Sequence, residues 1–238
     1  MTRGADRVIV ALDVTALPSA LAMARRLRGL VRTLKVGSAL FTACGPVAIE
    51  RIRALGFEVM LDLKFFDIPS TVELSCRAAA RHHVAMLTVH AAGGPAMLEA
   101  AVRGVREEAG RLRVRRPRVL GVTVLTSVGA ARPASVRATV LALAGSAVRA
   151  GCDGVVASAQ EAAALRKRFG RQLMIVCPGI RPVGGVWRAT SSHDQRRMGT
   201  PAQALMNGAD RLVIGRPITA ARDPRAAAQH LLKEIAQC

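Results

Sequence analysis

Short apolar runs alternate with longer segments rich in Ala, Leu and Arg along the whole chain. The apolar, β-branched runs predict buried strands, and the longer segments carry the period of helices that pack on such strands. This alternation is typical of a parallel sheet, because parallel neighbours need a helix-sized connection between them. The predicted strands are Val8–Leu12, Thr33–Val36, Glu58–Leu63, Met86–His90, Val119–Thr123, Gly154–Val156, Leu173–Val176 and Arg211–Ile214.

Helical segments follow nearly all of these strands. We predict them at Pro18–Leu30, Gly45–Leu55, Thr71–His82, Gly94–Ala109, Ser135–Ala150, Gln160–Phe169, Pro201–Asn207 and Pro224–Ala236. Eight strand–helix units in 238 residues predict a (β/α)8 TIM barrel, a fold of about 250 residues. A doubly wound open sheet is the alternative, but its usual glycine fingerprint is missing after the first strand. No linker or repeat divides the chain, so we expect a single domain over residues 1–238.

The charge of the chain is strongly positive but does not decide its function. Lys and Arg total 35 against 16 Asp and Glu, which gives a net charge of +19. Only four of the cations are lysines, and Arg occurs in almost every helical segment, as expected of an ordinary surface in which Arg replaces Lys. Aromatic residues make up 3% of the chain, too few for a platform on which bases stack. We therefore expect no nucleic-acid partner, although a basic nucleic-acid-binding protein stays a distinct alternative.

Cysteine usage and hydropathy point to the cytoplasm. The five cysteines show no C-x-x-C spacing, which favours reduced thiols over disulfides or a zinc site. The longest small and apolar stretch, Ala138 to Val148, is far shorter than the roughly 20 residues of a membrane span. We expect no membrane partner and no metal, because His, Asp and Glu show no convincing ligand spacing.

Charged residues end several predicted strands at the edge where barrel enzymes build their active sites. Alternation along the third strand puts Asp62 and Lys64 on one face, and such charges are costly to bury unless they are paired. An isolated pair of this kind is usually structural. Here Lys35 ends the neighbouring strand and Asp67 follows in the loop, and four alternating charges favour a site with tuned pKa values.

These residues lie within a segment that resembles a known family. Residues 62–71, DLKFFDIPST, resemble the D-x-K-x-x-D-I-P-x-T signature of orotidine 5′-phosphate decarboxylase. The likeness covers nearly the whole chain in the family's order. Its further blocks are Ala11–Asp13, Lys35–Gly37, Val89–Gly94, Val122–Ser127, Pro178–Arg181, Asp194–Gln195 and Gly215–Thr219.

The resemblance implies a decarboxylase that converts orotidine 5′-phosphate to uridine 5′-phosphate and carbon dioxide in pyrimidine biosynthesis. It implies that Lys64 gives a proton to C6 of the pyrimidine while Asp62 lies beside the departing carboxylate and holds Lys64. Lys35 joins this charged network and, with Asp13, binds the ribose. Loss of carbon dioxide leaves a carbanion, so a fixed cation must stabilise it, and we expect no cofactor.

The remaining implied contacts concern the base, the phosphate and a second subunit. Thr126, or the adjacent Ser127, would lie against the amide edge of the pyrimidine. Asp67, Ile68 and Thr71 would reach into the neighbouring site of a homodimer. The phosphate would be held by Arg181, Gln195, Gly215 and Arg216.

Three departures from the family pattern accompany the likeness. Phe66 and Ser70 stand where the family commonly has His and Asn, and we expect tuning rather than loss of activity. The segment between Arg181 and Gln195 is longer than expected, and we predict a phosphate-binding lid around residues 181–199. A magnesium-dependent 3-keto-gulonate 6-phosphate decarboxylase is the alternative within the superfamily, disfavoured by the sequences IPST and PGIR.

Overall fold

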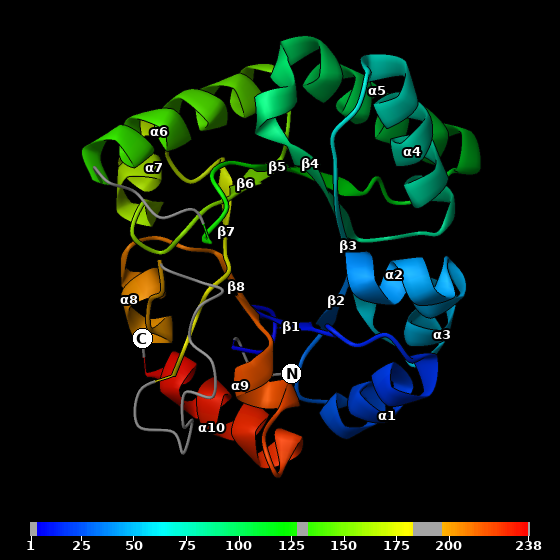
Figure 1. The fold of residues 1–238 in the computed structure, drawn as a ribbon, viewed down its shortest axis with the longest axis vertical. Helices are drawn as coiled ribbons and strands as arrows, with labels where there is room; N and C mark the ends of the chain where they lie inside the picture. The colour runs from blue at the N-terminus through cyan, green and yellow to red at the C-terminus, as the bar shows by residue number, and fades with distance from the viewer. Residues whose placement is uncertain (1–3, 128–132, 183–196, 238) are drawn as a thin grey trace.

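The computed structural model describes residues 4–127, 133–182 and 197–237. In this part of the chain every strand pairs in parallel with its sequence neighbours, and β1 pairs with β8 to close a barrel (Figure 1). This closure confirms the predicted (β/α)8 fold and excludes the open sheet. The strands are β1 (Val8–Ala11), β2 (Thr33–Gly37), β3 (Glu58–Phe65), β4 (Met86–His90), β5 (Arg118–Val122), β6 (Gly154–Val156), β7 (Met174–Cys177) and β8 (Arg211–Ile214).

Helices surround the strands in a ring (Figure 1). Several begin with a proline in the first turn, where its fixed φ suits the helix and its missing N–H costs no hydrogen bond. None of the described helices is long and apolar enough to cross a membrane. They are α1 (Leu17–Leu27), α2 (Ser38–Cys44), α3 (Val47–Ala54), α4 (Pro69–Arg81), η1 (Ala91–Gly93), α5 (Gly94–Leu112), α6 (Pro133–Arg149), α7 (Ala162–Phe169), α8 (Pro201–Met206), α9 (Arg216–Thr219) and α10 (Pro224–Ala236).

The prediction of a helix at Gly45–Leu55 was wrong about the residue at which the helix begins. Gly45 has φ +60° and its N–H donates to the Phe41 carbonyl, so it ends α2 rather than opening a helix. Glycine adopts such a positive φ without steric strain, because it has no Cβ. The chain then turns through Pro46 into α3, which begins at Val47.

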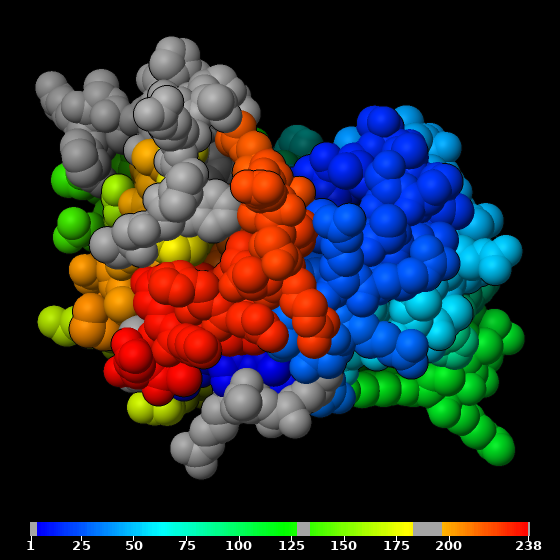
Figure 2. All heavy atoms as spheres, turned by 90° about the horizontal axis from the view of Figure 1, so that it is seen from below, coloured from blue at the N-terminus to red at the C-terminus, as the bar shows by residue number. Residues whose placement is uncertain are grey.

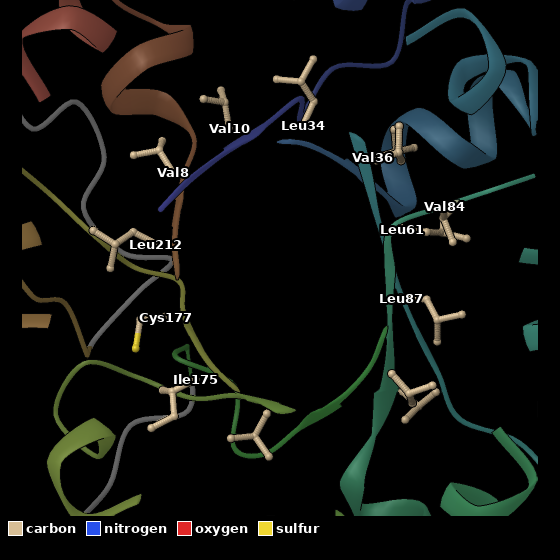
Figure 3. Close-up of a cluster of buried hydrophobic side chains, with 14 of the residues drawn as sticks. Val8, Val10, Leu34, Val36, Leu61, Val84, Leu87, Ile175, Cys177 and Leu212 are labelled. Carbon is tan, nitrogen blue, oxygen red and sulfur yellow. The ribbon is translucent and has the colours of Figure 1, made fainter. Parts of the chain in front are cut away.

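Two apolar layers stabilise the barrel. The larger lies between strands and helices, where Val10, Val36, Leu87 and Ile175 point outward from the ring of strands (Figure 3). The smaller fills the barrel interior and is made of Ile9, Ala11, Met60, Met86, Leu120, Val122, Val156, Val176 and Val213. Because side chains alternate along each strand, every strand contributes to one layer or both.

The first and last elements of the chain adjoin at the seam of the barrel. The blue N-terminal and the orange and red C-terminal residues adjoin in Figure 2, as β1 pairs with β8 and α1 packs against α10. Above the apolar interior, the carboxyl ends of the strands carry polar side chains. The fold therefore gathers residues from distant parts of the sequence at one mouth of the barrel.

Candidate active site

The register of the first three strands brings charged residues to the same level. Ala11 pairs with Lys35 across β1 and β2, and Gly37 pairs with Asp62 across β2 and β3. Asp13 lies two residues after the end of β1. Lys64 lies two residues beyond Asp62, on the same face as predicted, since Leu61 and Leu63 belong to the layer that faces the helices.

Four charged side chains form one connected network. The Lys35 Nζ lies 2.9 Å from Asp13 Oδ1 and 3.3 Å from Asp62 Oδ2. The Lys64 Nζ lies 3.0 Å from Asp62 Oδ1. Lys35 and Asp62 are buried, whereas a third of the Lys64 side chain is exposed. Asp62 therefore joins two ammonium groups, and the more open of these faces the barrel mouth.

The network fixes the ionisation of its buried members. Burial by itself raises the pKa of Asp62, but Lys35, Lys64 and two hydrogen bonds outweigh it and lower that pKa below its usual value. Burial lowers the pKa of Lys35, but the charges of Asp62 and Asp13 outweigh it and raise that pKa. Both groups are consequently charged near neutral pH, as buried charges are when well paired.

The backbone of Lys64 has an unusual conformation. Its φ is +51°, a left-handed value that residues other than glycine seldom adopt. The pairing of β3 with β4 shifts register between Leu61 and Phe65. The Lys64 N–H donates to the hydroxyl of Thr88 at 2.9 Å, and that hydroxyl donates to Asp62 Oδ1 at 2.9 Å.

Two glycines leave room beside the network. A Cβ on Gly37 would lie 3.0 Å from Lys35 Nζ and 3.4 Å from Asp13 Oδ1. A Cβ on Gly215, which follows β8, would lie 3.5 Å from Asp13 Oδ2. The predicted site residue Gly215 thus lies against Asp13, although the two are far apart in the sequence.

The other predicted binding residues lie at the same end of the barrel. Thr126 follows β5, Arg181 follows β7, and Arg216 opens α9 after β8. Gln195 lies outside the described residues, as does most of the predicted lid, residues 183–196.

Asp67, Ile68 and Thr71 are exposed to solvent. Asp67 Oδ1 accepts a hydrogen bond from the Ile68 N–H at 2.6 Å, just before α4 begins. Hence the structure joins three of the four alternating charges predicted at the mouth and adds Asp13, whereas the Asp67 carboxylate accepts a hydrogen bond from the neighbouring Ile68 N–H.

Comparisons with known proteins match nearly the full length of this chain to one family. A family model described as "Orotidine 5'-phosphate decarboxylase / HUMPS family" matches residues 6–231. This chain belongs to that family. A protein of Halorhodospira halophila named orotidine 5′-phosphate decarboxylase is 49% identical, over 98% of this chain and 97% of the relative. One of that name from Moorella thermoacetica is 47% identical, over 97% of this chain and 92% of the relative.

A solved structure supports the same assignment. The crystal structure of orotidine 5′-phosphate decarboxylase from Lactobacillus acidophilus has a TM-score of 0.81 and 34% identity, and the match covers 97% of this chain and 99% of that one. The resemblance stated from the DLKFFDIPST segment is therefore confirmed, and so is the prediction of an enzyme of the orotidine 5′-phosphate decarboxylase type.

One departure from the family pattern has a visible packing role. The ring of Phe66 meets the ring of His90 edge-on, with centroids 5.5 Å apart. Burial and the Lys64 charge lower the pKa of His90, although Asp62 partly offsets them. His90 is therefore neutral near pH 7 and lies beside the network without adding a positive charge.

Sequence reasoning missed two features near the mouth. Arg197 is buried and donates to Glu161 Oε1 at 2.8 Å and to the carbonyls of Val124 and Leu125 at 2.8 and 3.0 Å. It thereby ties residue 197 to the loop after β5. No local sequence pattern predicts this contact. Thr88, by contrast, is a polar residue at an inward position of β4. Strand alternation in the sequence could have identified it as a neighbour of the site.

Among the described residues, no group of three or more His, Cys, Asp or Glu side chains could hold a metal ion. Burial raises the pKa values of the thiols of Cys76, Cys152 and Cys177 to about 12. These three are free thiols, as predicted. At neutral pH they are protonated and therefore poor nucleophiles.

Proposed function

We propose that this chain converts orotidine 5′-phosphate to uridine 5′-phosphate and carbon dioxide with its own side chains and no cofactor. The observation that carries the proposal is the Lys64 ammonium, partly exposed at the barrel mouth and held 3.0 Å from the buried Asp62 carboxylate. An ammonium held in place by a buried carboxylate is what a developing carbanion requires, since it supplies positive charge without reorganisation.

In the proposed step the bond between C6 and the carboxylate carbon breaks, and its electron pair stays on C6. Carbon dioxide leaves, and the Lys64 ammonium stabilises the pair and then transfers a proton to C6. The neutral amine recovers a proton from water. No electron acceptor is needed, because the pair that leaves the carboxylate bond is the pair that receives the proton.

Asp62 has two roles in this proposal. Its carboxylate positions the Lys64 ammonium through the 3.0 Å ion pair, and it lies beside the substrate carboxylate. Repulsion between these two carboxylates would raise the energy of the bound substrate relative to the transition state. The lowered pKa of Asp62 supports this role, because the group keeps its charge near neutral pH.

The ribose and phosphate extend from this centre across the mouth. We assign Asp13 and Lys35 to the ribose, since their 2.9 Å ion pair lies beside the space that Gly37 and Gly215 leave. Arg181, Gly215 and Arg216, with Gln195, are assigned to the phosphate, which barrels of this fold commonly bind after strands seven and eight. Thr126 is assigned to the amide edge of the pyrimidine.

The active form in this proposal is a homodimer. Asp67, Ile68 and Thr71 of one subunit complete the site of the other. Large apolar side chains are exposed around this segment: Phe66 is 62% exposed, Ile68 64% and Leu74 67%. Exposed apolar groups gathered on one stretch favour a protein interface. Cytoplasmic location and the lack of a nucleic-acid partner stay predictions.

The test is the ultraviolet absorbance of orotidine 5′-phosphate mixed with purified protein in EDTA. Conversion to the spectrum of uridine 5′-phosphate, with carbon dioxide released in equal amount, is the expected result. No conversion by well-folded protein would reject the proposal. Activity on sugar phosphates that appears only when magnesium is added would favour the 3-keto-gulonate 6-phosphate alternative instead.

A further inference from the structure

Thr88 occupies a central position that no assigned role explains. It lies in the middle of β4 and is fully buried. Its side chain points into the barrel, since Met86, two residues before it, belongs to the interior layer. The neighbouring strand β3 carries Asp62 and Lys64.

One hydroxyl group makes both contacts of Thr88. It accepts the Lys64 N–H at 2.9 Å and donates to Asp62 Oδ1 at 2.9 Å. The same Oδ1 lies 3.0 Å from the Lys64 Nζ. A closed ring therefore runs from the backbone of Lys64 through Thr88 and Asp62 to the side chain of Lys64.

The local backbone explains why this hydroxyl matters. The β3–β4 ladder shifts between Leu61 and Phe65, and Lys64 has a left-handed φ of +51°. Such a conformation persists in a residue with a side chain only when its surroundings hold it. The Thr88 hydroxyl accepts the N–H of Lys64 at that point of the ladder. Thr88 is β-branched, so few rotamers are open to the hydroxyl.

We propose that Thr88 is a positioning residue that fixes where the Lys64 ammonium lies. Its one hydroxyl holds both the Lys64 backbone and the Asp62 carboxylate. This inference rests on the proposed role of Lys64 as the cation and proton donor at C6. Thr88 touches neither substrate nor reacting atom in this account.

The experiment compares two changes at Thr88 with one change just after the next strand, β5. Thr88→Val removes the hydroxyl and keeps the shape, and Thr88→Ser keeps the hydroxyl. The matched control is Thr123→Val, because Thr123 is buried and its hydroxyl donates to the Val156 carbonyl at 2.8 Å, outside the charged network. Each variant is measured for kcat and KM with orotidine 5′-phosphate and for thermal unfolding.

Thr88→Val is expected to lower kcat by about 10- to 100-fold, the effect of losing a hydrogen bond to a charged group. KM stays within a few-fold of wild type, since the ribose and phosphate contacts remain. Thr88→Ser restores most of kcat. Thr123→Val lowers the unfolding temperature but leaves kcat close to wild type.

The pH profile supplies a second readout. The groups around Asp62 are Asp13 after β1, Lys35 of β2, Lys64 of β3 and His90 of β4, and all remain in Thr88→Val. Loss of a hydrogen bond to the charged carboxylate raises the pKa of Asp62. The acid limb of kcat/KM therefore moves to higher pH in Thr88→Val and stays in place in Thr123→Val.

The measurements distinguish a failure of the proposed function from a failure of the proposed role of Thr88. If wild type itself does not decarboxylate the substrate, the proposed function fails. If wild type is active, Lys64→Ala is inactive, and Thr88→Val keeps the wild-type kcat and pH profile, only the role of Thr88 is overturned. The role is also overturned if Thr88→Val and Thr123→Val lose equal activity in proportion to their loss of folded protein.

Discussion

The charge that each residue of the network carries is stabilised by the opposite charges beside it. Asp62 is buried between two ammonium groups, and Lys35 is buried between two carboxylates. A buried charge whose partner is removed is strongly destabilising, because its desolvation is no longer compensated. The site can therefore present Lys64 to a substrate only while the other three charges are in place.

Asp62→Asn tests this coupling through stability. The folded pKa of Asp62 lies below its ordinary value of 3.8, so its contribution is present above pH 3.8 and is lost as pH falls through the folded pKa. We expect Asp62→Asn to lower the free energy of unfolding by about 3 kcal/mol at pH 7. Urea unfolding at pH 7, 5 and 3 should show the gap between variant and wild type narrowing only at the lowest pH. A gap that is constant with pH would contradict the account.

Gly37→Ala tests the space beside Lys35. The added Cβ would lie 3.0 Å from Lys35 Nζ, so the ammonium must shift by a few tenths of an ångström within its ion pairs. Because a misplacement of about 1 Å can cost about 100-fold, we expect this smaller shift to lower kcat/KM by about 3- to 10-fold with little loss of stability. Gly110→Ala is the control, since its Cβ meets open space within α5. Steady-state kinetics that place both variants near wild type would refute the close packing.

At the scale of elements, periodicity predicted the eight strands and most helices because those patterns reflect burial on a repeating geometry. It missed α2 and α9, which are short and begin directly after Gly37 and Gly215 at strand ends. Such segments have too few turns to show a helical period. It also placed Asp62 and Lys64 on one face, but alternation alone could not predict the left-handed backbone of Lys64, which depends on the pairing with β4.

The carboxylate of Glu108 is buried where α4 contacts α5, and its contribution to stability can be measured. Hydrogen bonds from Arg111 and Arg81 lower the pKa of Glu108 to about 2. Its contribution to stability is present above the ordinary value of 4.5 and is lost as pH falls toward 2. We expect Glu108→Gln to lower the thermal unfolding temperature at pH 7, and this deficit to shrink below pH 4. The neighbouring Glu107→Gln should change little, because that side chain is 48% exposed. Equal deficits would contradict the assignment.

At the scale of the whole molecule, the barrel explains why one mouth collects the predicted residues. The charged network could be predicted from strand ends, since the carboxyl ends of parallel strands meet at one edge. Contacts such as Arg197 with Glu161 could not, because they depend on how loops after different strands pack. Asp67 is exposed and is not one of the four side chains of the charged network, so its proposed role in the site of a second subunit is the main question at this scale.

Mixing two inactive variants tests whether sites are shared. If Asp67 acts in the partner's site, a heterodimer of Lys64→Ala and Asp67→Ala has one intact site, with Lys64 from one chain and Asp67 from the other. Unfolding and refolding an equal mixture should restore about a quarter of wild-type activity, since half of the dimers are mixed and each has one good site. Activity no higher than that of the two variants measured separately would place Asp67 outside the partner's site.

The most direct test of the central claim compares Lys64→Ala with Lys167→Ala, which removes an exposed lysine from α7. Decarboxylation of orotidine 5′-phosphate is measured in EDTA at saturating substrate, with circular dichroism to confirm that both variants are folded. We expect a loss of at least about 1,000-fold for Lys64→Ala and wild-type turnover for Lys167→Ala. A folded Lys64→Ala enzyme that turns over within about tenfold of wild type would contradict the role of Lys64 at C6.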